Sequence, residues 1–413
     1  MVASLEAPYS GFKAVRDTSG DISLIMNCLA YKNGTAYNQA SAGTPDTTGI
    51  LYDSIYVRHW DTWLTQQRYA VFAATLSAID GGYTFDGDIS NLLSGIEAPV
   101  TRPESPVQPF GGSGDYDLSP DGSQVVFLTK APELAKANYT ASYLYLVPHD
   151  GSSVARQLNG PGTSAPVEAQ GASGAPVWSP DGTRIAYFQQ DGISYESDRS
   201  KLYIADVQSG NITPVAANWD SSIGTIRWSQ DCDDLWVTSD YWASTRLFII
   251  PTNADADFKP TNITDVTSVS EFHILPDGRS LVTATAIWSS ANFYTVTNTA
   301  DVNMLYKANE HDLNLVGLGA QDLEYVWYEG TLGDQQQALI VYPTDFDPNK
   351  VYDLIFYVHG GPQGFTGNTW STRWNLRTWT DQGYVLFGAN PTGSTSYGQG
   401  LTDRIQGKWG GWP

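Results

Sequence analysis

The stretch "PVWSPDGTRIAYFQQ", residues 176–190, joins a short apolar segment, a Pro-Asp-Gly turn and a second segment in which apolar residues alternate. Proline presets φ at such a turn, and glycine supplies the positive φ that closes a hairpin. The same motif recurs as "YDLSPDGSQVVFLTK" from Tyr116 and as "FHILPDGRSLVTATA" from Phe272. A weaker copy is "TIRWSQDCDDLWVTS" from Thr225. The aspartates of these four turns recur at intervals of 46 to 60 residues, the period of a propeller blade; they are Asp121, Asp181, Asp231 and Asp277.

Each hairpin is followed by a third apolar segment, such as "KLYIADVQSG", and then by an edge strand, as in "GNITPVA". Radial repetition of small antiparallel sheets limits the number of exposed edges in an all-β chain. We therefore predict a mostly β fold in which residues 1–320 form an incomplete β-propeller of WD40- or TolB-like blades. Because the chain begins in what resembles the middle of a blade, amino-terminal blades are expected to be missing.

The pattern changes near Leu318. The segment "YDLIFYVHG", residues 352–360, is a continuous apolar run suited to burial on both faces, and a short helical stretch separates it from a second buried strand at residues 384–389. Alternation of strand and helix predicts a parallel sheet. Residues 321–413 are therefore interpreted as the first strands of an α/β-hydrolase domain that is truncated.

The tetrapeptide "HGGP", residues 359–362, follows the first of these strands. Two glycines let the backbone turn tightly and point amide N–H groups outward, where they suit a developing oxyanion in acyl transfer. An ordinary turn is the alternative interpretation. No Gly-x-Ser-x-Gly nucleophile elbow is found, and His359 is the last histidine, so a Ser-His-Asp triad cannot be assembled and the chain is predicted to be inactive alone.

Composition narrows the classes of partner. The net charge of −22 disfavours a nucleic acid or an anionic membrane surface. The two cysteines show no pattern of a zinc site, and "MVASLEAPYS" has no features of a signal peptide. Four Asn-x-Ser/Thr sequons permit glycosylation without proving it; they begin at Asn33, Asn138, Asn211 and Asn262.

The strings "YDSIYVRHWDTW", "SYESDR", "TAIWSS", "HGGPQG" and "NPTGSTSYGQGLTD" resemble the fungal secreted dipeptidyl-peptidase 5 branch of the prolyl oligopeptidase family of serine peptidases. The resemblance covers essentially the whole chain. It implies a propeller followed by an α/β-hydrolase domain, secretion, and release of dipeptides from peptide amino termini through an acyl-enzyme, without a metal or an organic cofactor.

Carried over to this sequence, the resemblance makes the backbone N–H of Gly361 an oxyanion donor, with Gly360 and His359 shaping its loop. In the later loop, Thr392 stands where related enzymes often have arginine, and Ser396 stands where glycine is usual.

Related enzymes also hold the substrate's α-ammonium group with propeller carboxylates. In a strand, Glu196 and Asp198 would share one face and form such a cradle, whereas a solvated acidic turn that pairs with Arg199 is the alternative. Arg58 could clamp a substrate carbonyl or carboxylate, or serve with Asp61 as a structural partner while its aromatic neighbours form core.

Peptides are thus the expected partners. Two other hypotheses remain open at this point: a catalytically dead propeller that binds peptides or proteins, and a lipase- or esterase-type hydrolase.

Overall fold

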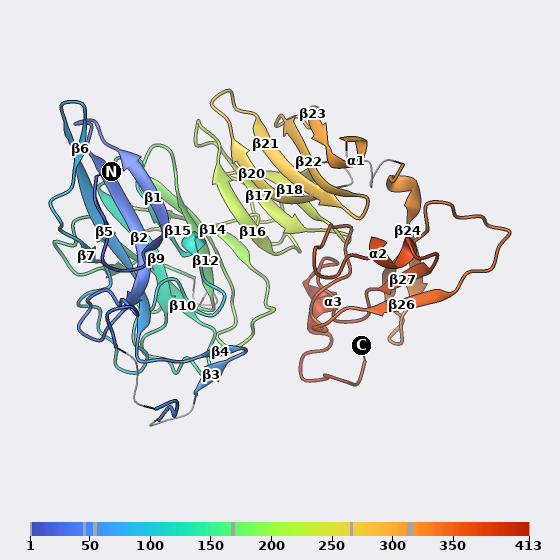
Figure 1. Ribbon diagram of the computed structural model, residues 1–413, viewed down its shortest axis with the longest axis horizontal. Coiled ribbons are helices and arrows are strands. Elements are labelled where there is room, and N and C mark those ends of the chain that lie inside the picture. The colour runs from blue at the N-terminus through green and yellow to red at the C-terminus, as the bar shows by residue number, and fades with distance from the viewer. Residues whose placement is uncertain are drawn as a thin grey trace. The chain divides into compact units, whose positions relative to one another are not determined.

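The computed structural model describes residues 2–43, 47–52, 56–166, 170–264, 267–311 and 317–412. The chain divides into two compact units, the first comprising Met1–Glu196 and Lys201–Val215 and the second comprising Ser197–Ser200 and Ala216–Pro413. Figure 1 shows that both units are built mainly of strands, which confirms the predicted mostly β fold.

The first unit contains three sheets of four or five strands and one small hairpin. In its first sheet β1 (Ser10–Arg16), β2 (Ile22–Ala30) and β5 (Arg68–Ile79) lie side by side, and β6 (Gly82–Thr84) and β7 (Ser90–Asn91) both pair with β5. The hairpin consists of β3 (Arg58–His59) and β4 (Thr62–Trp63).

The next two sheets of the first unit are four-stranded and antiparallel. The second sheet is formed by β8 (Tyr116–Leu118), β9 (Gln124–Lys130), β10 (Ser142–Pro148) and β11 (Arg156–Gln157), with a 3-10 turn at Ser113–Asp115 before it. The third sheet is formed by β12 (Ser173–Trp178), β13 (Arg184–Gln189), β14 (Lys201–Asp206) and β15 (Ile212–Val215).

The second unit begins with two sheets of the same kind. The fourth sheet is formed by β16 (Ile223–Trp228), β17 (Asp234–Asp240), β18 (Thr245–Pro251) and β19 (Thr261–Asn262). The fifth sheet is formed by β20 (Ser268–Ile274), β21 (Ser280–Ala286), β22 (Ser289–Val296) and β23 (Val302–Lys307), after which α1 (Ala308–His311) follows.

The repeated Pro-Asp-Gly motif accounts for the recurrence of four-stranded antiparallel sheets. Each Pro-Asp-Gly turn joins the first two strands of a sheet, and the aspartate accepts a hydrogen bond from the backbone two residues later, as Asp181 does from the Thr183 N–H at 3.0 Å. The predicted third strand and edge strand are β14 and β15 in the third sheet. Short-range turn chemistry therefore sets the local topology of each sheet.

Apolar side chains of neighbouring sheets pack against one another within each unit. Phe72, Tyr116 and Phe127 belong to the core between the first and second sheets. Trp236 and Phe272 belong to the core between the fourth and fifth. Full burial of one such side chain contributes about 1.5–3 kcal/mol to folding, so these contacts are the main source of stability.

The last sheet differs from the others because it contains a parallel pair. Its order is β24 (Leu323–Glu329), β25 (Gln335–Val341), β27 (Val385–Ala389) and β26 (Leu354–Val358), and β26 runs parallel to β27. A 3-10 turn at Ala320–Asp322 precedes it, α2 (Arg377–Thr380) lies between the parallel strands in sequence, and α3 (Gln399–Asp403) follows them.

The prediction that residues 354–358 are buried on both faces is wrong for the described residues. Leu354, Phe356 and Val358 are 63%, 62% and 70% exposed, while Ile355 and Tyr357 pack against the core of this sheet. The reason is that, among the described residues, a packed layer covers only the face of β26 that carries Ile355 and Tyr357.

Candidate functional site

The loop after β26 carries the predicted oxyanion residues. Gly361 has φ of +128°, a region that side chains rarely adopt, and a Cβ there would lie 2.5 Å from the Gln363 nitrogen. In contrast, a Cβ added at Gly360 would have no other described atom within 4 Å. Only the second glycine is therefore required by the path of the backbone.

The His359 side chain contacts both its own loop and a segment that follows β27. Its Nδ1 is 2.8 Å from the Gly360 carbonyl oxygen, and its Nε2 is 3.1 Å from the Ser394 hydroxyl oxygen. Because a carbonyl oxygen only accepts hydrogen bonds, Nδ1 carries a proton, and in the neutral imidazole Nε2 accepts from the Ser394 O–H. The histidine thus connects the loop at residues 359–364 to the segment at residues 391–398.

A further hydrogen bond joins the two segments, and another ties the second segment to α3. The Thr395 N–H donates to the Gly364 carbonyl at 3.0 Å, and the Thr402 hydroxyl donates to the Ser394 carbonyl at 3.2 Å. Ser394 is fully buried. Its hydroxyl is therefore a structural partner of His359 and not an exposed nucleophile.

Ser396 has φ of +80°, a conformation that favours glycine. Its hydroxyl accepts a hydrogen bond from the Ala243 N–H at 2.9 Å, and its carbonyl accepts from the Trp242 N–H at 2.9 Å. The Thr392 hydroxyl accepts from Gln336 Nε2 at 2.8 Å in a buried environment. Hydrogen bonds from residues distant in sequence thus hold the turn at a position that lacks glycine.

Sequence reasoning missed the buried Asn390 at the end of β27. Its Oδ1 accepts from the Thr366 N–H at 2.6 Å, and its Nδ2 donates to the Thr366 carbonyl and the Tyr397 hydroxyl. Burial raises the pKa of Tyr397, so its hydroxyl stays protonated and donates to Gln337 at 3.0 Å. A lone asparagine after an apolar strand gives no signal of such a network.

The candidate substrate-binding residues Arg58 and Glu196 lie in the first unit. The Arg58 guanidinium stacks over the Trp63 ring at 5.4 Å, and His59 Nε2 lies 3.8 Å from a Glu196 carboxylate oxygen. Burial lowers the pKa of His59, while the negative charge of Glu196 opposes that shift. The β3–β4 hairpin therefore brings the His59 imidazole near Glu196, while the Arg58 guanidinium contacts Trp63 of the same hairpin.

Two expectations about these segments are corrected. The aromatic neighbours of Arg58 are not core, because Trp60 and Trp63 are 69% and 54% exposed, and Trp60 lies 6.1 Å from the exposed Phe110 ring. Residues 196–198 form a turn, as in the alternative interpretation, so alternation along a strand does not place Glu196 and Asp198 on one face.

Asp198 lies in the second unit, where its Oδ1 accepts from the Arg199 N–H at 2.8 Å. The Arg199 guanidinium donates to the carbonyls of Trp219 and Ala217. Gln399 of α3 donates to the Ser197 carbonyl at 2.7 Å. These contacts fix the start of the segment that leads into β14.

The sequon asparagines differ in exposure. Asn33, Asn138 and Asn211 are exposed, whereas Asn262 in β19 is half-buried. Their glycosylation stays a prediction. Among the described residues, no helix combines the length and apolar character needed to cross a bilayer.

Comparisons with known proteins test the resemblance. The model of the prolyl oligopeptidase family matches residues 370–413. Dipeptidyl-peptidase 5 of Aspergillus fumigatus is 49% identical over 416 aligned positions, covering 100% of this chain and 57% of that protein. Dipeptidyl-peptidase 5 of Aspergillus oryzae is 46% identical, with coverage of 100% and 57%. The predicted resemblance is confirmed.

Solved structures show a likeness of fold. Acylaminoacyl peptidase of Pyrococcus horikoshii matches with a TM-score of 0.65 at 14% identity, covering 97% of this chain and 54% of that chain. Dipeptidyl peptidase 4 of Porphyromonas gingivalis matches with a TM-score of 0.53 at 11% identity, with coverage of 95% and 50%. The chain spans between 50% and 57% of the length of these proteins.

Proposed function

We propose that this chain, a homologue along its full length of fungal dipeptidyl-peptidase 5 in the prolyl oligopeptidase family, is part of a secreted serine-type dipeptidyl-peptidase. The complete enzyme would release dipeptides from peptide amino termini through an acyl-enzyme. The single observation that carries this proposal is the identity of 46–49% over the whole chain with proteins of that name. The same identity favours a peptidase over a catalytically dead binding module.

The architecture belongs to the same proposal. Residues 1–320 would form propeller blades, and residues 321–413 would begin an α/β-hydrolase domain. Support comes from the regular four-stranded antiparallel sheets before α1 and from the parallel β26–β27 pair after it.

The chemical role proposed for this chain is stabilisation of the oxyanion. When a serine attacks the scissile carbonyl, the carbonyl oxygen gains negative charge, and the Gly361 N–H would donate to it from a loop shaped by Gly360 and His359. Loss of one such donor lowers kcat by roughly 100- to 1000-fold in enzymes of this kind. The hydrogen bond between His359 and Ser394 supports this role because it fixes the loop before substrate arrives.

The serine, aspartate and catalytic histidine would come from polypeptide outside these 413 residues, which contain no Gly-x-Ser-x-Gly elbow. The chain by itself is therefore proposed to be inactive. Glu196, Asp198 and Arg58 would bind the substrate's amino-terminal end, with His59 orienting Glu196. No metal or organic cofactor enters this scheme.

The test compares two proteins: the 413-residue chain and the protein translated from the complete transcript. We expect only the second to release a chromogen from a dipeptidyl substrate and to react with a serine-directed fluorophosphonate. Hydrolysis by the 413-residue chain that the inhibitor abolishes would show that the proposed inactivity is wrong. A complete transcript that ends at Pro413, together with no hydrolysis, would favour the binding-module hypothesis.

A further inference from the structure

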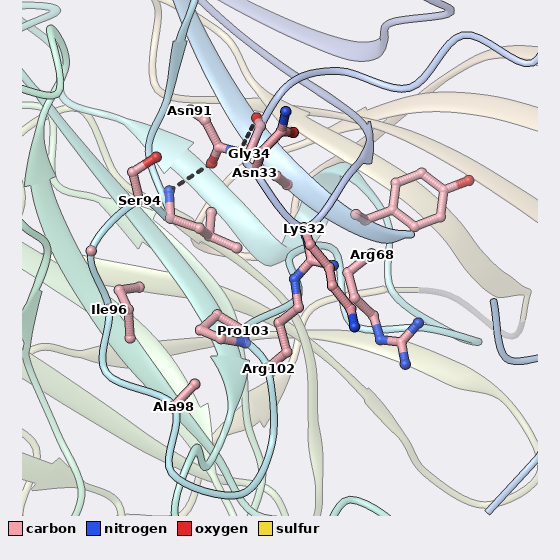
Figure 2. Close-up of a pocket in the computed structure, with 14 residues that line it drawn as sticks. Lys32, Asn33, Gly34, Arg68, Asn91, Ser94, Ile96, Ala98, Arg102 and Pro103 are labelled. Atoms are coloured by element: carbon pink, nitrogen blue, oxygen red, sulfur yellow. Dashed lines mark hydrogen bonds between the residues drawn. The ribbon is translucent and has the colours of Figure 1, made fainter. Parts of the chain in front are cut away.

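A cavity of about 540 Å³ lies in the first unit, where β2 ends and β5 begins. Ala30 and Arg68 are paired across these two strands, and the segment from Leu93 to Pro103 passes over the cavity. Figure 2 shows Lys32, Arg68 and Arg102 on the same side of this cavity.

The lining of this cavity has an unusual charge. Three of its fourteen lining residues are cationic, namely Lys32, Arg68 and Arg102, and none is acidic. The chain as a whole has 44 acidic and 22 basic residues, so a cavity wall whose charged residues are all basic is not expected from the composition of the chain. Among the described residues, none of these three cations forms an ion pair with a carboxylate. Such a wall attracts anions.

The two guanidinium groups are held in place by backbone carbonyls. Arg102 donates to the carbonyls of Tyr31 at 2.6 Å and Gln66 at 3.0 Å, and Arg68 donates to the carbonyl of Gln67 at 2.7 Å. These bonds use Nη1 and Nη2 of Arg102 and Nη1 of Arg68. Within the described part of the chain, Nε and Nη2 of Arg68 and Nζ of Lys32 have no acceptor, so they are available to a ligand.

The cations also repel one another. Burial lowers the pKa of Arg102, and the positive charge of Arg68 lowers it further. The nearby carboxylate that opposes this effect, Glu104, pairs with Lys136. Adjacent like charges destabilise a fold unless a counter-ion is bound, and a pre-oriented cluster of them is typical of binding sites.

We propose that this cavity binds a compact small molecule with at least two anionic oxygen groups, a polycarboxylate or an oligophosphate, through Lys32, Arg68 and Arg102. The guanidinium plane of Arg68 matches the spacing of two oxygens, while the Lys32 ammonium is a mobile point charge. Asn91, which also lines the cavity, donates to the Gly34 carbonyl at 2.8 Å and so holds the segment that carries Lys32 (Figure 2). This proposal does not depend on the peptidase activity proposed above.

A purely structural role is the rival explanation. Arg102 alone would tie the segment before Pro103 to the end of β2 through its carbonyl bonds. Arg68 and Lys32 have no such function across the cavity, so they distinguish the two explanations. Asn33, a sequon residue, also lines the cavity, and the protein for the test should come from a host that does not glycosylate it.

The experiment is calorimetric titration of the 413-residue chain with citrate and, separately, with tripolyphosphate at constant 0.15 M ionic strength, which screens non-specific attraction. We expect one saturable site for at least one probe, and the preferred probe assigns carboxylate or phosphate chemistry. Arg68→Gln should weaken binding about tenfold or more, the usual effect of losing one charge-assisted contact. Arg16→Gln, at an exposed arginine of β1 outside the cavity, should leave binding unchanged.

A second variant keeps the test decisive if Arg68→Gln fails to fold. Ala98 is exposed and lines the cavity, so Ala98→Trp would fill it without removing a cation or a core contact. This variant should melt as the parent does but lose binding. Absence of saturable binding of both probes to the folded parent would overturn the proposal. So would equal binding by the parent and the folded Ala98→Trp variant.

Discussion

The Nε2 atom of His359 lies 3.1 Å from the hydroxyl oxygen of the fully buried Ser394. This bond joins the loop after β26 to the segment after β27. Removing it should therefore loosen the loop that presents the Gly361 N–H.

The first prediction concerns Ser394→Ala. The loss of one hydrogen bond to a buried hydroxyl should lower the free energy of unfolding by about 1 kcal/mol. Urea unfolding followed by tryptophan fluorescence measures this change. Ser153→Ala, at an exposed serine, is the matched control and should have no effect. Equal stability of both variants would mean that the bond to His359 does not fix the loop.

The second prediction compares the two glycines of the loop. Gly361→Ala should destabilise by roughly 1–3 kcal/mol, because it places a side chain at φ of +128° and a Cβ 2.5 Å from the Gln363 nitrogen. Gly360→Ala has open space around its Cβ and should change stability by much less. Thermal melts of both variants test this order, and a reversed order would contradict the described path of the loop.

The third prediction uses the pH dependence of stability. Burial raises the pKa of Asp115 from 3.8 to about 6, although the Val107 N–H, which donates to it at 2.8 Å, opposes the shift. The folded state thus binds a proton more tightly than the unfolded state. The destabilisation is fully present above pH 6 and is relieved as pH falls toward 4.

Asp115→Asn should remove this destabilisation, because an amide oxygen can accept the same bond without carrying a charge. The variant should gain roughly 1–3 kcal/mol over the parent at pH 7 to 8, and the gain should shrink between pH 6 and pH 4. Urea unfolding at several pH values gives the difference, in which the titration of histidines cancels. A difference that does not change with pH would refute the buried-carboxylate interpretation.

The fourth prediction concerns the exposed apolar face of β26. Leu354, Phe356 and Val358 should make the 413-residue chain associate and bind an apolar fluorescent dye. Val358→Thr should reduce dye binding, whereas Ile355→Thr, on the packed face, should increase it by weakening the core. A monomeric chain with a cooperative melt and no dye binding would contradict this expectation.

The fifth prediction concerns recognition of the substrate in the complete enzyme. Glu196→Gln should raise KM for a dipeptidyl substrate about three- to tenfold and change kcat little, because an exposed carboxylate would lose its attraction for the α-ammonium group. Glu271→Gln, at a carboxylate of similar exposure that also lies near a histidine, is the control. Unchanged KM in the Glu196 variant would remove this residue from the proposed site.

The sequence by itself determined the local topology of the sheets. Pro-Asp-Gly turns and alternating apolar residues act over fewer than about twenty positions, so the repeat at Asp121, Asp181 and Asp277 predicted each hairpin and its following strand. The alternation of strand and helix after Leu318 predicted the parallel pair β26–β27. The glycine-rich loop at residues 359–362 was also visible, since Gly361 is required by backbone conformation alone.

Only the tertiary structure decided which distant residues meet. His359 contacts Ser394, Ser396 contacts Ala243, and Glu196 contacts His59. The members of each pair are so far apart in sequence that no periodic pattern predicts the contact. Burial was misjudged at β26 and at Trp60 because an apolar side chain is buried only where another layer covers it. Lys32, Arg68 and Arg102 likewise become one cationic cavity only because β2 and β5 pair and the following segment folds back over their ends.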